Sequence, residues 1–98
     1  MRMKVVFVSP RIGGGNDISA DQAAVMCASK ALESTYGKDI FSKEGNGALY
    51  VMIPETDPSK ILVTILTDLP TEKVAMFEQS VPRELNRAGF NGVSQRLV

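Results

Sequence analysis

The sequence is dominated by two stretches, MKVVFVSP at residues 3–10 and KILVTILT at residues 60–67. Successive side chains of a β-strand point to opposite faces of the sheet, so a strand with one wet face alternates apolar and polar residues. Within them, residues 3–8 and 61–66 instead carry apolar side chains at consecutive positions, with Lys4 and Thr64 as the one interruption of each run. We therefore predict two central strands in a sheet of which neither face is exposed to solvent. In a chain this short, we expect another molecule to cover one of the two faces.

Length and composition indicate one ordinary folded domain over residues 1–98. The chain is 44% hydrophobic and 22% charged, which is typical of a globular protein and excludes disorder of the whole chain. Lys and Arg number 11, as do Asp and Glu, so the formal net charge is zero. Proteins that bind nucleic acid through phosphates normally carry an excess of basic residues, so this class of function is disfavoured.

The cysteine and histidine content narrows the chemistry further. Cys27 is the single cysteine, so no disulfide can form within the chain, and we expect a reducing, cytoplasmic location. No window approaches the ~20 apolar residues that a membrane span needs, so no membrane partner is expected. Histidine, the commonest metal ligand and general base, is absent from the sequence, and we predict neither a metal site nor a cofactor.

Local signals between the two stretches predict a helix, a second strand and a hairpin. Ser19-Ala20-Asp21-Gln22 has the spacing of a capping box that opens a helix, and Gly37 ends it. An apolar stripe on this helix is predicted to bury Cys27. Residues 47–53 form the second strand, and the turn-rich residues 55–59 then predict an antiparallel hairpin into residues 60–67.

A second helix and a last strand complete the chain. Pro70 favours a helix start beside Thr71, because proline is tolerated in the first turn. Pro82 interrupts this helix, but the apolar face continues through it, so we predict one kinked helix that stops at Gly89. Residues 93–98 are predicted to form a short edge strand.

The order strand, helix, strand, strand, helix, strand is that of the ferredoxin-like βαββαβ fold. We therefore predict an α+β domain in which a four-stranded antiparallel sheet has both helices on one face. In this architecture the first and third strands are central, and these are the two strands that are apolar on both sides. An uncovered apolar patch on them is the leading candidate site.

This patch is predicted to bind protein, either a second copy as a homodimer or a larger partner. The side chains favoured for the interface are Val5, Phe7, Ile61, Val63 and Ile65, although periodicity does not settle which alternate set points outward. Phe7 is the only aromatic residue on the two strands, so the stacking platform of RNA recognition motifs is missing. A small, neutral, non-enzymatic chain suits a stoichiometric modulator, including inhibitors carried by phages and other mobile elements.

The loop that follows the first strand is a weaker candidate. The glycine-rich loop before the first helix, comprising Gly13, Gly14, Gly15 and Asn16, could hold an anion or contact a partner. It lacks the residues that complete a P-loop or a dinucleotide-binding loop, and Asp17 and Asp21 would repel a phosphate there.

Alternative functions remain in two other classes. A nucleic-acid-binding module would use the arginines near the C-terminus, namely Arg83, Arg87 and Arg96. A small dimeric α+β barrel enzyme would need Tyr36, Tyr50 and a carboxylate to do chemistry, because no histidine can activate Cys27 or Ser9. No catalytic residue is therefore assigned.

Overall fold

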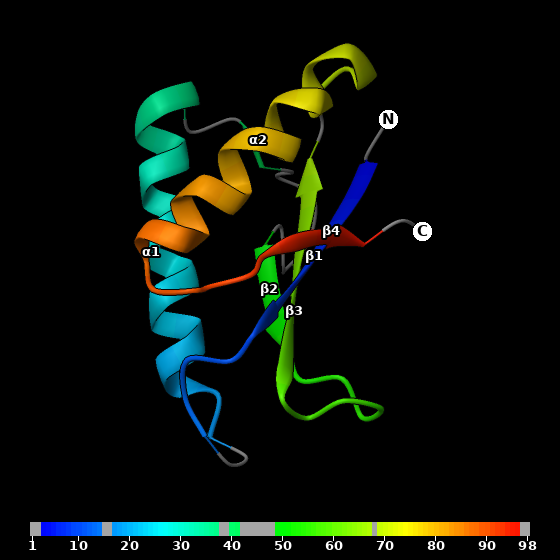
Figure 1. The fold of residues 1–98 in the computed structure, drawn as a ribbon. Coiled ribbons are helices and arrows are strands. Elements are labelled where there is room, and N and C mark those ends of the chain that lie inside the picture. The colour runs from blue at the N-terminus through cyan, green and yellow to red at the C-terminus, as the bar shows by residue number, and fades with distance from the viewer. Residues whose placement is uncertain (1–2, 15–16, 38–39, 42–48, 68, 97–98) are drawn as a thin grey trace.

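The protein is a two-layer assembly of helices on a sheet, seen in a computed structural model that describes residues 3–14, 17–37, 40–41, 49–67 and 69–96 (Figure 1). The strands are β1 (Met3–Pro10), β2 (Leu49–Met52), β3 (Lys60–Thr67) and β4 (Ser94–Arg96), and the helices are α1 (Ser19–Tyr36) and α2 (Thr71–Arg87). Both long strands have the bounds that the sequence predicts. The outer parts of the predicted second and last strands, residues 47–48 and 97–98, lie outside the described residues.

The four strands form one antiparallel sheet in the order β2-β3-β1-β4. β1 and β3 are central, as predicted, and pair along their full length from Met3 opposite Thr67 to Pro10 opposite Lys60. The hairpin from β2 to β3 is antiparallel, which confirms that prediction as well. The α+β class with a four-stranded sheet and two helices is therefore correct. No helix in the described parts of the chain is long and apolar enough to cross a membrane.

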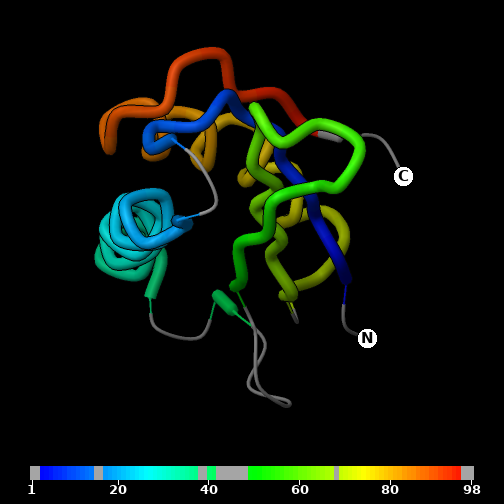
Figure 2. The backbone as a smooth tube through the Cα atoms, turned by 90° about the horizontal axis from the view of Figure 1, so that it is seen from below, coloured from blue at the N-terminus to red at the C-terminus, as the bar shows by residue number. Residues whose placement is uncertain are grey.

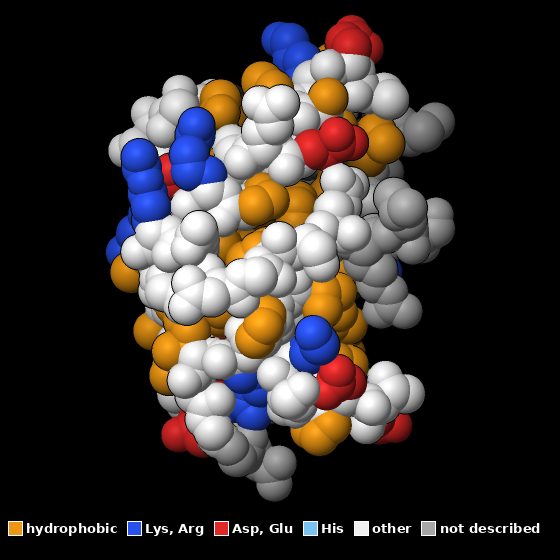
Figure 3. Space-filling view, in the orientation of Figure 1, with side chains coloured by type: hydrophobic (Ala, Val, Ile, Leu, Met, Phe, Trp, Pro, Cys, Tyr) orange, Lys and Arg blue, Asp and Glu red, His pale blue; other side chains and the backbone are white. Residues whose placement is uncertain are grey.

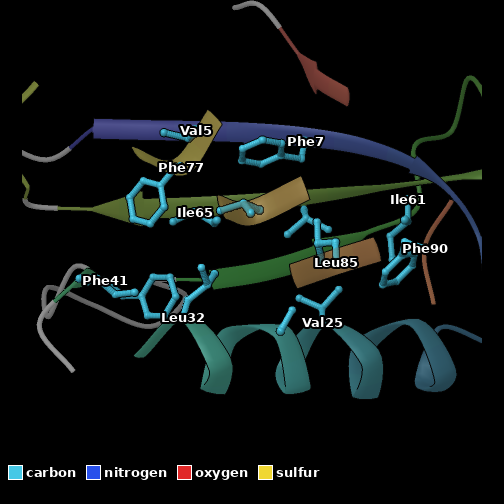
Figure 4. Packing of buried hydrophobic residues seen from close by; sticks show 14 residues of the cluster. Val5, Phe7, Val25, Leu32, Phe41, Ile61, Ile65, Phe77, Leu85 and Phe90 are labelled. Carbon is cyan, nitrogen blue, oxygen red and sulfur yellow. The ribbon is translucent and has the colours of Figure 1, made fainter. Parts of the chain in front are cut away.

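A single core fills the space between the sheet and the helices (Figure 4). Val25 and Leu32 point from α1 toward the strands, and Phe77 and Leu85 reach the same cluster from α2. Ile40 and Phe41 are also buried there, and the Thr67 hydroxyl donates a 2.6 Å hydrogen bond to the Ile40 carbonyl. Because both helices share one cluster with one face of the strands, the opposite face of the sheet is left without a helix. Figure 2 shows α1 nearly end-on beside the strands.

The register of the central strands differs from the predicted interface. Five side chains favoured for binding a partner lie on the helix-covered face and are buried in the core: Val5, Phe7, Ile61, Val63 and Ile65. A partner cannot reach them in this fold, so the alternate residues of β1 and β3 form the uncovered face. A shift of one residue exchanges the two faces of a strand, and runs that are apolar on both faces give little information about which is which.

Helix α1 begins at Ser19, as predicted, but not through a capping box. Ile18 is the N-cap, and it makes no side-chain capping bond. The Asp17 carboxylate instead accepts a 2.9 Å hydrogen bond from the Ser19 backbone N–H, so an acidic residue earlier in the chain satisfies this donor. The buried face is centred on Val25 and Leu32, which leaves Cys27 exposed rather than buried.

Helix α2 continues through Pro82, as predicted, and ends in a Schellman motif. Phe90 N–H donates to the Leu85 carbonyl at 3.0 Å, and Gly89 N–H donates to the Asn86 carbonyl at 3.1 Å. Gly89 has φ of +117°, a backbone conformation that glycine adopts without steric cost. Phe90 and Leu85 are both buried in the core, so the turn that ends the helix also contributes an apolar side chain to the core.

Lysine substitutions at two adjacent positions of β3 should show which face of the strand is buried. Val63→Lys places an ammonium group in the core, and we expect the loss of the folded state, since burying an unpaired charge removes several of the ~5–15 kcal/mol that stabilise a domain. Leu62→Lys lies on the uncovered face, and we expect a folded protein. Far-UV circular dichroism with thermal melting measures both. A folded Val63→Lys and an unfolded Leu62→Lys would show that the register is reversed.

Candidate functional site

The face of the sheet opposite the helices, called the open face below, is the first candidate surface. Strand pairing places its residues, because side chains opposite each other in a ladder point to the same side. One row runs from Tyr50 through Thr64 to Val6, and the next from Met52 through Leu62 to Val8. A third pair, Lys4 with Leu66, lies toward the start of β1. On β1, β2 and β3 the open face therefore consists of Lys4, Val6, Val8, Tyr50, Met52, Leu62, Thr64 and Leu66, and the β4 positions 94 and 96 pair opposite Val8 and Val6.

Exposure on the open face rises toward β2. Val6 and Thr64, at its centre, are only 6% and 3% exposed. Tyr50 and Met52, on the edge strand, are 38% and 47% exposed. The remaining apolar members, Val8, Leu62 and Leu66, are half-buried. The accessible apolar surface is therefore displaced from the central strands toward β3 and β2.

The polar interruptions of the two long strands mark this face. Lys4 and Thr64 belong to the open face, whereas the alternate positions of β1 and β3 face the helices. Lys4 thus carried the signal that fixes the register, because a lysine on a central strand is far less costly where water reaches it, whereas Thr64 is only 3% exposed. Sequence reasoning missed Tyr50, Met52 and Leu62 because it did not use this signal.

The glycine-rich loop is held by a buried ion pair between Arg11 and Asp21. An Arg11 Nη2 to Asp21 Oδ2 distance of 3.2 Å joins side chains that are 4% and 0% exposed. The Asp21 carboxylate also accepts a 2.9 Å hydrogen bond from the Ile12 backbone N–H. Gly13 lies directly beside it, since a Cβ atom there would be 3.4 Å from Asp21 Oδ2. The chain's own carboxylate thus occupies the place that an anion would take.

Arg11 connects three segments of the chain. Its Nη2 donates a 2.8 Å hydrogen bond to the Asp17 carbonyl, and its backbone N–H donates to the Ser59 carbonyl at 3.1 Å. Hydrogen bonds from the Ser19 hydroxyl and then its backbone N–H, with a smaller effect of the Arg11 charge, hold the pKa of Asp17 below its ordinary value. Two carboxylates at this helix start make phosphate binding unfavourable. Gly15 and Asn16 of the predicted loop lie outside the described residues, while Gly14 is exposed.

Two of the three arginines predicted for nucleic-acid contact, Arg83 and Arg87, lie beside the carboxylate of Glu84, which offsets part of their positive charge. Glu84 Oε1 lies 3.2 Å from Arg87 Nη1 and 3.8 Å from Arg83 Nε. On the face seen in Figure 3, acidic side chains show among the Lys and Arg side chains, which form no continuous stripe. Arg96 lies on β4 and not on α2, and its backbone pairs with Val6 of β1. The structure therefore brings Arg83 and Arg87 together but not into a basic patch.

The candidates for catalysis are scattered. Cys27 is exposed beside a groove of about 190 Å³ between α1 and α2, and Ser9 is buried with its hydroxyl donating to the Pro10 carbonyl at 3.0 Å. Tyr36 packs against the core at the end of α1, whereas Tyr50 lines a different groove with no carboxylate among its described lining residues. Within the described ranges, no three acidic or cysteine side chains lie close enough to hold a metal ion.

Comparison with protein-family models, with curated proteins and with solved structures found no match for this chain.

Removing one partner of the buried ion pair should destabilise the fold. Asp21→Ala leaves the Arg11 guanidinium buried without its carboxylate and the Ile12 N–H without its acceptor, so we expect the free energy of unfolding to fall by about 3–5 kcal/mol. Replacing both residues together, as Arg11→Met with Asp21→Leu, should cost much less, because no charge stays buried. Urea denaturation measures both, with Glu78→Ala as an exposed-carboxylate control. A loss below about 1 kcal/mol for Asp21→Ala would contradict a stabilising pair.

Proposed function

We propose that this chain is a small, non-enzymatic protein-interaction module that binds another protein through its open face. The observation that carries the proposal is the gathering of apolar side chains on a sheet face that neither helix covers. Tyr50, Met52 and Leu62 form its accessible part, and Val8 and Leu66 extend it. Apolar patches of this kind on soluble proteins commonly mark protein-binding sites.

We infer further that the fold belongs to the ferredoxin-like βαββαβ class. The element order, the antiparallel pairing and the central position of β1 and β3 support this inference. A sheet with helices on one face is suited to binding because the strand ladder holds the other face rigid and no helix covers it. The fold itself does not specify a function, since this architecture serves many unrelated ones.

The open face sets the chemistry of the partner. Lys4 is its only charged member on β1, β2 and β3, so most of the contact is apolar and a complementary partner surface is apolar too. Binding without chemistry implies a role as a stoichiometric modulator of the partner. The partner we propose is a larger protein, with a second copy stacked face to face as the alternative.

A lysine on the open face should abolish partner binding without unfolding the chain. Purified wild type, Leu62→Lys and the exposed-site control Glu78→Lys serve as baits for capture from the native host, with absorbance recorded at 260 and 280 nm. We expect one protein to be retained in near-equal amount by wild type and Glu78→Lys and at least tenfold less by Leu62→Lys, because a buried ammonium opposes the apolar contact.

Two results of this capture would contradict the proposal. Equal retention by all three baits would place binding outside the open face. Salt-sensitive capture of nucleic acid, seen as excess absorbance at 260 nm, would favour the arginine-based alternative. Circular dichroism of each bait establishes that a loss of binding is not a loss of fold.

A further inference from the structure

Among the strands that the structure describes, the outer edge of β2 has no neighbour, and its backbone N–H and C=O groups point outward. β3 pairs with one side of β2, and no other strand formed by the described residues pairs with the other side. In an antiparallel ladder every second residue directs both its N–H and its C=O away from the neighbouring strand. Water can hydrogen-bond these groups one by one, but among protein segments an extended chain is the one that pairs with such a row along its length.

The two edges of the sheet differ in how they are protected. β4 is three residues long and carries Ser94, Gln95 and Arg96, a short polar edge of the kind that discourages strand addition. β2 carries Leu49, Tyr50, Val51 and Met52, with no charge and no proline within the strand. Of the two edges, β2 is therefore the one that favours the addition of a strand.

A groove lies beside the β2 edge, and none of the described residues that line it is charged. Its volume is about 310 Å³, and its described lining consists of Gln22 and Met26 from α1 with Leu49, Tyr50 and Val51 from β2. Met26 is 50% exposed. Four large hydrophobic side chains are exposed among the described residues, and three of them flank this edge: Met26 on the helix side and Tyr50 and Met52 on the open-face side. An added strand would therefore contact apolar side chains on both of its faces.

We propose that the β2 edge pairs with β2 of a second copy of this chain, antiparallel and about a two-fold axis perpendicular to the sheet. An uncharged groove disfavours a charged strand, and the sequence of β2 is itself uncharged and apolar throughout. A two-fold axis makes each copy both donor and acceptor of the same contact. It also keeps the helices of both copies on one side, so Leu49 and Val51 of each copy extend the apolar lining of the other's groove.

This pairing uses the backbone edge of β2, which shares Tyr50 and Met52 with the open face but leaves Val8, Leu62 and Leu66 outside the contact, and it does not depend on the proposed function. It would join two four-stranded sheets into one continuous sheet and bring Tyr50 and Met52 of both copies to its middle. The two apolar open faces would then form a single longer surface.

The mass and the amide exchange of the full chain test the pairing. Light scattering across a concentration series, with reductant present because Cys27 is exposed, should rise from 10.6 kDa to twice that mass. Hydrogen exchange of the β2 amides should slow with rising concentration, since edge amides become bonded. Met26→Glu should raise the concentration for half-dimerisation at least tenfold, because both copies place a carboxylate in the apolar contact. Ala23→Glu, exposed on α1 and outside the described groove lining, should leave it unchanged.

Three outcomes would overturn the pairing. The first is a monomer at every concentration up to about 1 mM, the weak end of specific association. The second is a dimer whose β2 amides exchange at the monomer's rate, which would indicate stacked open faces instead. The third is a dimer that Met26→Glu does not weaken. Leu62→Lys, which removes apolar contact from the open face alone, should keep the edge-paired dimer, so failure of the proposed function is measured separately.

Discussion

The antiparallel pairing of β1 with β3 is the constraint on which the structure depends. Eight residues face eight without a bulge, so one register determines which side chains enter the core and which do not. The helices cover the face that carries Phe7 and Ile61, and the alternate residues of β1 and β3 lie on the other face. The shorter strands can then only be edges, since both central positions are taken. The surfaces open to a partner are therefore consequences of how two strands align.

Most elements could be predicted because each has a local signal. The two long strands follow from consecutive apolar residues, and Gly37 and Gly89 end their helices where the sequence indicates. The register could not be read from apolarity alone, because both faces of β1 and β3 are apolar. The register depends on the free energy of burial, which is far less favourable for Lys4 than for Val5. Only the position of that one lysine in the run indicates which face is exposed.

The sites were harder to predict because they join residues that are distant in sequence. Asp21 belongs to a segment that resembles a capping box, yet its carboxylate binds Arg11 and the Ile12 N–H, and this pairing depends on how the loop folds back. Met26 resembles any exposed residue of an amphipathic helix until β2 is placed beside it. The sequence of elements predicts that β1 and β3 are central, but no local pattern encodes how closely α1 approaches β2, so the groove could not be anticipated.

The buried pair of Arg11 and Asp21 limits how this chain can vary. Each side chain is enclosed and makes hydrogen bonds that hold the start of α1 to the end of β1. A change at either position alone leaves a charge in the interior, whereas a joint replacement by apolar residues removes both charges together. In chains descended from a common ancestor, positions 11 and 21 should accordingly change together or not at all, although ten residues separate them.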